Sequence, residues 1–161
     1  MKEYHIQYQP CKKYHFVNDI SLLMNSVYNE NHISYLSEDS YINNFLEKGD
    51  KDNKLQHIFK TFIPDKLVYC GVHFVDSNEN NLSKAIPEYI TKFNEKPKVF
   101  LIKEDTYNLY ISSNSIRKCQ DIESVLKSHL MCYNENNIIL EDNEIKYLNN
   151  WEAEKFRKSI K

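Results

Sequence analysis

Two short apolar segments stand close together in the chain, Lys98-Val99-Phe100-Leu101-Ile102 and Tyr107-Asn108-Leu109-Tyr110-Ile111. Both are rich in β-branched and aromatic residues, which is typical of β-strands. A short polar turn that includes Glu104-Asp105 separates them. The sequence therefore predicts a β-hairpin over residues 98–111.

A helix is predicted directly after the hairpin. Ser112-Ser113-Asn114-Ser115 supply side chains that can cap its N-terminus. Its apolar face carries residues three or four positions apart: Ile116, Cys119, Ile122, Leu126, Leu130 and Tyr133.

The same kind of spacing predicts four further helices. They cover residues 13–28, 37–46, 86–93 and 141–156, and the third is entered at Pro87.

The segment before residue 98 completes the predicted fold. Residues 67–75 form a short apolar run after Ile63-Pro64-Asp65, which predicts a buried strand. Residues 48–54 are polar throughout, which predicts an exposed loop and the boundary within the chain. The mixed order of helices and strands predicts an α/β or α+β fold, in a single domain over residues 1–161.

Composition excludes several classes of protein. The formal net charge is −2 and the two signs are interspersed, which argues against nucleic acid as a partner. No run of 18 apolar residues occurs and the first residues are polar, so we expect no membrane segment, no signal peptide and a cytoplasmic location. Gly49 and Gly71 are the two glycines, so no P-loop, dinucleotide-binding fingerprint or nucleophile elbow can be written.

Cysteine and histidine spacing provides no local active site. The four cysteines, at positions 11, 70, 119 and 132, form no C-x-x-C pair and predict buried, reduced thiols. None of the six histidines pairs with another at a spacing of two or four residues. We interpret His73 and His129 as partly buried, hydrogen-bonded side chains and His32 as a solvent-facing or capping residue. Cys70 and His73 would point to opposite faces of the predicted strand, which argues against a catalytic cysteine–histidine pair. Adjacent acids such as Glu141-Asp142 lie where helices are predicted to start, so we expect them to cap helices.

Four segments in the second half of the chain form an ordered series: Phe62-Ile63-Pro64-Asp65-Lys66-Leu67-Val68-Tyr69-Cys70-Gly71, Lys96-Pro97-Lys98-Val99-Phe100-Leu101-Ile102, Ile122-Glu123-Ser124-Val125-Leu126-Lys127-Ser128-His129 and Leu148-Asn149-Asn150-Trp151-Glu152-Ala153-Glu154-Lys155-Phe156-Arg157. Together they resemble the class II aldolase/adducin family, especially its bacterial rhamnulose-phosphate aldolase-like branch. The first looks like that branch's F-P-D-x-V-V-Y-C-G segment and the last like its N-W-E-A-E-K-[FY]-R string. The resemblance covers residues 60–158, and residues 1–60 match poorly.

The resemblance implies a three-layer α/β/α fold with a mostly antiparallel sheet, often assembled as tetramers. It also implies a divalent metal, usually zinc, held by three histidines, and a glutamate that acts as acid and base during carbon–carbon cleavage. The chain contains no H-x-H pair. Asn31-His32 resembles the family's N-H-G segment, so His32 would match the third metal histidine.

These features lead to two competing expectations. In the first, the chain is a truncated or split class II aldolase-like protein, incomplete and inactive alone. A complementary N-terminal aldolase-like chain, or a homo-oligomer, would then complete a zinc-dependent sugar-phosphate aldolase. In the second, the chain is a non-catalytic interaction or scaffold module that retains the fold. Both expectations predict an open sheet edge and an uncovered apolar face. A third interpretation is an α/β binding protein that is unrelated to the family.

Overall fold

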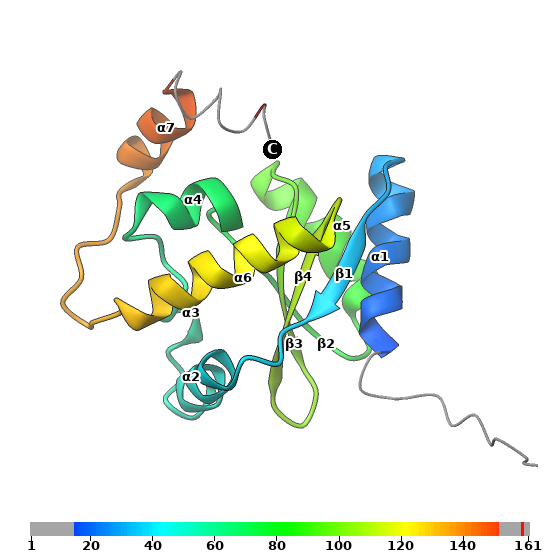
Figure 1. The fold of residues 1–161 in the computed structure, drawn as a ribbon, viewed down its shortest axis with the longest axis horizontal. Helices are drawn as coiled ribbons and strands as arrows, with labels where there is room; N and C mark the ends of the chain where they lie inside the picture. The colour runs from blue at the N-terminus through cyan, green and yellow to red at the C-terminus, as the bar shows by residue number, and fades with distance from the viewer. Residues whose placement is uncertain (1–14, 152–158, 160–161) are drawn as a thin grey trace, which may run out of the picture.

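The computed structural model describes residues 15–151 and residue 159. A four-stranded sheet with the order β1-β4-β3-β2 lies at its centre (Figure 1). The β4 strand pairs antiparallel with both of its neighbours, whereas β2 and β3 are parallel. The chain is therefore a mixed α/β protein with an open, mostly antiparallel sheet. Its strands are β1 (Ile33–Leu36), β2 (Val75–Asn78), β3 (Val99–Lys103) and β4 (Tyr107–Ser113).

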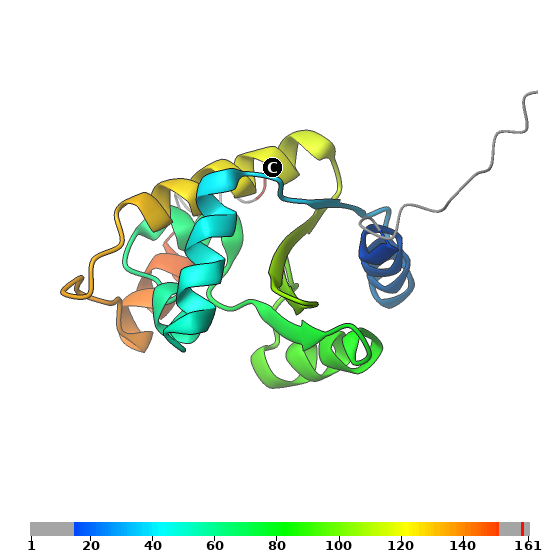
Figure 2. The ribbon, with the colours of Figure 1, turned by 90° about the horizontal axis from the view of Figure 1, so that it is seen from below.

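Helices cover both faces of the sheet (Figures 1 and 2). On one face lie α1 (His15–Tyr28) and α5 (Leu82–Phe93). The opposite face carries α2 (Ser40–Lys51), α3 (Leu55–Ile58), α4 (Pro64–Cys70) and α6 (Ile116–Met131). The last helix, α7 (Asp142–Asn150), packs against α4.

The β3 strand is buried on both faces, which explains its continuous apolar sequence. Val99 and Leu101 face the α6 side, and Phe100 and Ile102 face the α1 and α5 side. The predicted hairpin is confirmed, since β3 and β4 pair from Val99 opposite Ile111 to Lys103 opposite Tyr107.

The predicted helix over 13–28 is confirmed as α1 from His15 onward, with residues 13 and 14 outside the described residues, and the helix after Ser115 is confirmed as α6. The Ser115 side chain accepts a hydrogen bond from the Lys118 backbone N–H at 3.3 Å, which caps α6 as expected. Its predicted apolar face is buried at Cys119, Ile122, Leu126 and Leu130, although Ile116 is half exposed.

The predicted strand over residues 67–75 is wrong. Residues 64–70 form α4, and the strand β2 begins only at Val75. Pro64 lies in the first turn of α4, where its missing N–H is not needed, and Gly71 ends the helix with φ of 82°. A short apolar run suits a buried helix as well as a buried strand, so periodicity alone could not separate them.

Three other predicted boundaries change in the structure. The predicted loop over 48–54 is wrong in its first half, because α2 continues to Lys51 and buries Gly49. Pro87 lies inside α5, which begins at Leu82, so the predicted entry at Pro87 is also wrong. The final helix ends at Asn150, and most of its predicted remainder lies outside the described residues.

The expected uncovered sheet face is absent from the described part of the chain, because helices pack on both sides. The expected open edge is present: within residues 15–151, β1 pairs only with β4 and β2 pairs only with β3. Across that same range, no helix combines the length and apolar character needed to cross a membrane.

Candidate functional site: the His32 pocket

A cavity of about 360 Å³ lies at the end of the sheet where β1 and β3 begin and β4 ends. We call it the His32 pocket. The first turn of α6 and the last residues of α4 complete its wall. Its polar lining includes His32, Lys96, Lys98, Ser113, Asn114 and Lys118.

The His32 side chain is buried, with an exposed fraction of 1%. Its interpretation as a solvent-facing residue is therefore wrong. The backbone N–H of His32 donates to the Asn25 side chain, and ring atom Nδ1 lies 3.1 Å from the Glu30 carbonyl oxygen. Because a carbonyl oxygen only accepts, this contact requires the proton to be on Nδ1.

The other ring nitrogen of His32 has no hydrogen bond within the described residues. This atom, Nε2, is buried. The Glu30 carboxylate oxygen Oε2 lies 3.9 Å away, beyond hydrogen-bond reach. With the proton on Nδ1, the neutral ring carries its lone pair on Nε2. Metal-ligating histidines commonly have this arrangement, in which a carbonyl oxygen holds the opposite ring nitrogen.

Three lysines line the pocket together with His32. Lys96, Lys98 and Lys118 belong to its wall, and among the described lining residues Asp121 is the one acid. Lys96 Nζ pairs with the Glu30 carboxylate at 2.6 Å. This Lys96 contact holds the pKa of the exposed Glu30 below its usual range.

Lys98 is held at the C-terminus of α4, where its Nζ donates to the carbonyl oxygens of Val68 and Tyr69 at 3.3 and 3.2 Å. Lys118 lies in the first turn of α6, where the helix dipole adds positive potential. The described lining of the His32 pocket therefore carries three lysines and one acid, and one of these lysines is paired with Glu30.

The other sequence-predicted candidates do not join this site. His129 is fully buried and stacks on Phe62 with ring centroids 4.0 Å apart. His73 stacks on Phe93, with its Nδ1 3.7 Å from Glu95 Oε1. Burial is the main cause that lowers the pKa of His73.

The cysteines mostly follow the prediction of buried thiols. Cys70 and Cys119 are buried and reduced, and burial raises their pKa values to about 12 and about 11. The Cys70 thiol contacts the Ile122 carbonyl oxygen at 3.6 Å, as expected for an unreactive core residue. Cys132 is exposed, so the prediction is wrong there, and Cys11 lies outside the described residues.

The described residues do not by themselves fit a metal ion. Among them, no group of three His, Cys, Asp or Glu side chains is placed to hold one. A zinc site needs three or four such ligands, and His32 offers one. Two of the acids that the sequence assigned to helix caps have that role, since Asp39 caps α2 and Glu141 forms a capping box with Glu144 on α7. Glu152 and Glu154 lie outside the described residues.

Sequence reasoning singled out His32 but missed the lysines around it. Lys96 and Lys98 precede β3, and Lys118 follows β4 by five residues, so only the pairing of these strands brings the three side chains to one pocket. Comparison of the chain with protein-family models, with curated proteins and with solved structures finds no match.

Proposed function

We propose that this chain is an incomplete, class II aldolase-like protein of sugar metabolism that acts in the cytoplasm. It contributes one imidazole and a basic pocket to a site that another chain completes, and it is inactive as a lyase by itself. The completed enzyme is a zinc-dependent aldolase that takes a phosphorylated sugar.

The observation that carries the proposal is the state of the His32 ring. A buried nitrogen without a hydrogen bond is unfavourable unless a ligand satisfies it. The Glu30 carbonyl oxygen orients the ring and occupies Nδ1, and Nε2 is the buried ring nitrogen that no hydrogen bond from the described residues satisfies. His32 is also the position that resembles the third metal histidine of the family.

The lysines support the choice of substrate class. Lys96, Lys98 and Lys118 place positive charge around His32, and a phosphate group is the most highly charged part of a sugar phosphate. Lysine ammonium groups bind phosphate as point charges. The pocket volume of about 360 Å³ is within the range of small-molecule sites.

The first experiment is reconstitution of the complex. The tagged chain is purified from its own cells, and co-purifying chains are screened for a paired-histidine H-x-H segment. The purified partner and this chain are then mixed, and zinc content and cleavage of rhamnulose 1-phosphate are measured. We expect zinc and cleavage in the mixture and neither in the separate chains.

Matched histidine variants make this experiment specific. His32→Ala should preserve the complex and lose zinc and cleavage, because it removes one ligand. His57→Ala is the control, since His57 contacts Tyr133 at the other end of α6. A complex that keeps its zinc in His32→Ala contradicts the proposal, as does the failure of any H-x-H chain to bind.

The second candidate is a non-catalytic interaction module that retains the fold. The absence of an H-x-H pair from the whole sequence favours it. On this reading, a partner binds the chain without zinc, and His32→Ala leaves complex formation unchanged. The zinc content of the reconstituted complex therefore separates the two candidates.

A further inference from the structure

A second cavity, of about 580 Å³, lies between α5 and the segment that leads into α7. We call it the α5–α7 cavity. The Leu140 backbone N–H donates to the Thr61 carbonyl oxygen at 2.8 Å, which holds this segment in place as one wall. None of the residues that line the His32 pocket lines this cavity. The two sites are therefore separate.

Aromatic rings form much of the lining of the α5–α7 cavity. The imidazole of His73 stacks on Phe93 almost in parallel, with centroids 3.7 Å apart and an interplanar angle of 14°. Phe59 and Phe74 form a second pair, with centroids 5.0 Å apart. All four residues line the cavity. Such surfaces suit an apolar or flat ligand, and aromatic ring faces also attract cations.

Two carboxylates line the same cavity. Asp76 and Glu88 lie at exposed positions of β2 and α5, and within the described residues no lysine, arginine or histidine pairs with either. Asp76 accepts only neutral hydrogen bonds, from Tyr107 Oη at 3.2 Å and Gln56 Nε2 at 3.4 Å. Partial burial of the carboxylate raises the pKa of Asp76, and the hydrogen bonds from Tyr107 and Gln56 act in the opposite direction.

The basic side chains at the cavity do not neutralise this pair. Lys92 Nζ lies over the Phe93 ring, 4.9 Å from its centroid, and among the described residues Lys60 forms no ion pair with Asp76 or Glu88. Glu141 and Asp142 also line the cavity, but they are accounted for by the N-terminus of α7. Counted together, the described lining carries four acidic side chains and two lysines, in the same cavity as the aromatic rings.

We propose that the α5–α7 cavity binds a small organic cation, an amine with an apolar or aromatic body. The ammonium group pairs with Asp76 and Glu88, and the body packs against the His73–Phe93 and Phe59–Phe74 rings. This site is independent of the proposed aldolase-like function, since it shares no lining residue with the His32 pocket.

A ligand series on the unmodified full-length chain tests the charge requirement. The probes are 2-phenylethylamine, 2-phenylethanol and 3-phenylpropionate, which present the same ring with a positive, neutral or negative end. Binding is followed by amide chemical shifts. We expect saturable shifts at residues of the α5–α7 cavity with the amine, and at least about tenfold weaker binding of the alcohol. Equal binding of the three probes, or no binding of the amine up to millimolar concentrations, overturns the proposal.

Variants test the assignment of the carboxylates. Asp76→Asn and Glu88→Gln remove one charge each with little change in shape, and each should weaken amine binding several-fold. Asp105→Asn, in the exposed turn between β3 and β4, is the matched control and should bind like the parent. Because the two variants lie on different elements, one of them remains informative if the other fails to fold. Unchanged amine affinity in a folded variant of each carboxylate overturns the assignment, and His32→Ala should leave affinity unchanged.

Discussion

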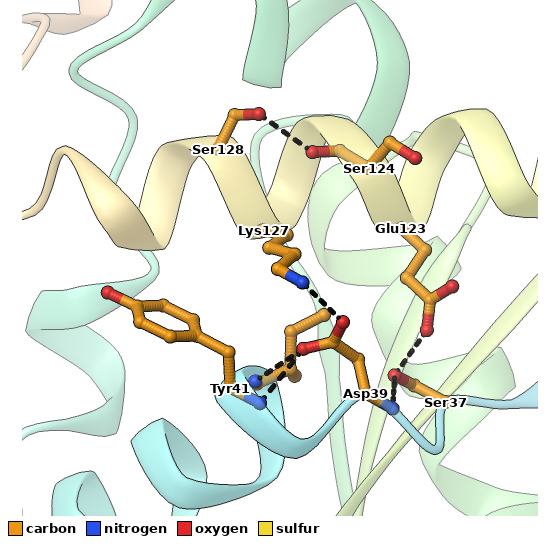
Figure 3. A network of polar contacts seen from close by, with 8 residues as sticks. Ser37, Asp39, Tyr41, Glu123, Ser124, Lys127 and Ser128 are labelled. Carbon is orange, nitrogen blue, oxygen red and sulfur yellow. Dashed lines mark hydrogen bonds and ion pairs between the residues drawn. The ribbon is translucent and has the colours of Figure 1, made fainter.

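Lys127 Nζ lies 2.7 Å from Asp39 Oδ2, across 88 residues of sequence (Figure 3). The other oxygen of the same carboxylate accepts the backbone N–H groups of Tyr41 and Ile42, at 2.9 and 3.1 Å. One side chain therefore caps α2 and also ties it to α6, the two helices that cover the same sheet face. Next to it, Ser37 Oγ donates to the Glu123 carboxylate.

Removal of the Asp39 carboxylate should destabilise the fold. Asp39→Ala loses the cap and the ion pair, and we expect a decrease of about 1–2 kcal/mol in the free energy of unfolding. Asp39→Asn keeps a capping oxygen, so its free energy of unfolding should decrease less than that of Asp39→Ala. Urea unfolding at pH 7 measures both, with Asp105→Ala as the surface control. A decrease no larger than that of the control contradicts the capping role.

The contribution of Asp39 should disappear in acid. The hydrogen bond from Lys127 is the largest cause that holds the pKa of Asp39 below its unfolded value of 3.8. A lowered acid pKa stabilises the native state above the unfolded pKa, and this contribution is lost as pH falls through the folded pKa. The stability difference between the parent chain and Asp39→Asn should therefore be constant from pH 5 to 7 and shrink below pH 4. If the stability difference between the parent chain and Asp39→Asn does not change with pH, the pKa of Asp39 is not lowered by folding.

Ionisation of Glu123 should destabilise the fold, whereas ionisation of Asp39 stabilises it. Burial raises the pKa of Glu123 above its unfolded value of 4.5, so the ionised carboxylate is less favourable in the native state than in the unfolded chain. Glu123→Gln keeps an acceptor for Ser37 and should raise the melting temperature at pH 7, by up to about 2 °C. The gain should vanish near pH 4, where the unfolded carboxyl is also protonated. Thermal unfolding at both pH values measures the difference, and a lower melting temperature at pH 7 contradicts it.

Lys66 should make stability rise in mild base. Its side chain is almost fully buried, and its Nζ donates to Val72 O at 2.7 Å and Thr61 Oγ1 at 3.2 Å. Burial lowers its pKa from 10.5 to about 8. Between these values the unfolded chain binds more protons, so the free energy of unfolding increases with pH, by up to about 1.4 kcal/mol per pH unit.

Lys66→Met isolates this effect from the titration of other groups. The stability of the parent minus that of Lys66→Met should rise between pH 8 and 10, as measured by urea unfolding at closely spaced pH values. Lys84→Met, an exposed lysine on α5, is the control and should show no such rise. If the stability difference between the parent and Lys66→Met stays constant between pH 8 and 10, burial does not destabilise the charged Lys66 amine.

Leu126 tests the core between α6 and the sheet. Its side chain is fully buried, in the same cluster as Ile42, Leu101 and Leu109. Leu126→Ala should lower the free energy of unfolding by about 2–5 kcal/mol, because it leaves a cavity. Met131→Ala, at an exposed position of the same helix, should change it by less than about 0.5 kcal/mol. If Leu126→Ala and Met131→Ala change the free energy of unfolding by similar amounts, Leu126 is not packed in the core between α6 and the sheet.

Residues 64–75 and His32 show where local patterns become insufficient. The apolar run that contains Val68 is buried as the sequence indicates, but its helix depends on Pro64 and on the turn at Gly71. For His32, sequence order does not reveal burial, because the lysines that share its pocket precede β3 or lie on α6, more than 60 positions away in the chain. The carboxylate pair of Asp76 and Glu88 is likewise formed by β2 and α5 and has no local signature.

The sequence by itself determined the β3–β4 hairpin and the helices α1 and α6. Their signals are local, since alternation, three- and four-residue spacing and N-cap residues act within a few positions of the chain. Only the tertiary structure decided that Lys96, Lys98 and Lys118 surround His32, and that one carboxylate of Asp39 links α2 to α6. The physical reason is that strand pairing and helix packing bring together residues far apart in sequence, and no short-range pattern records those contacts.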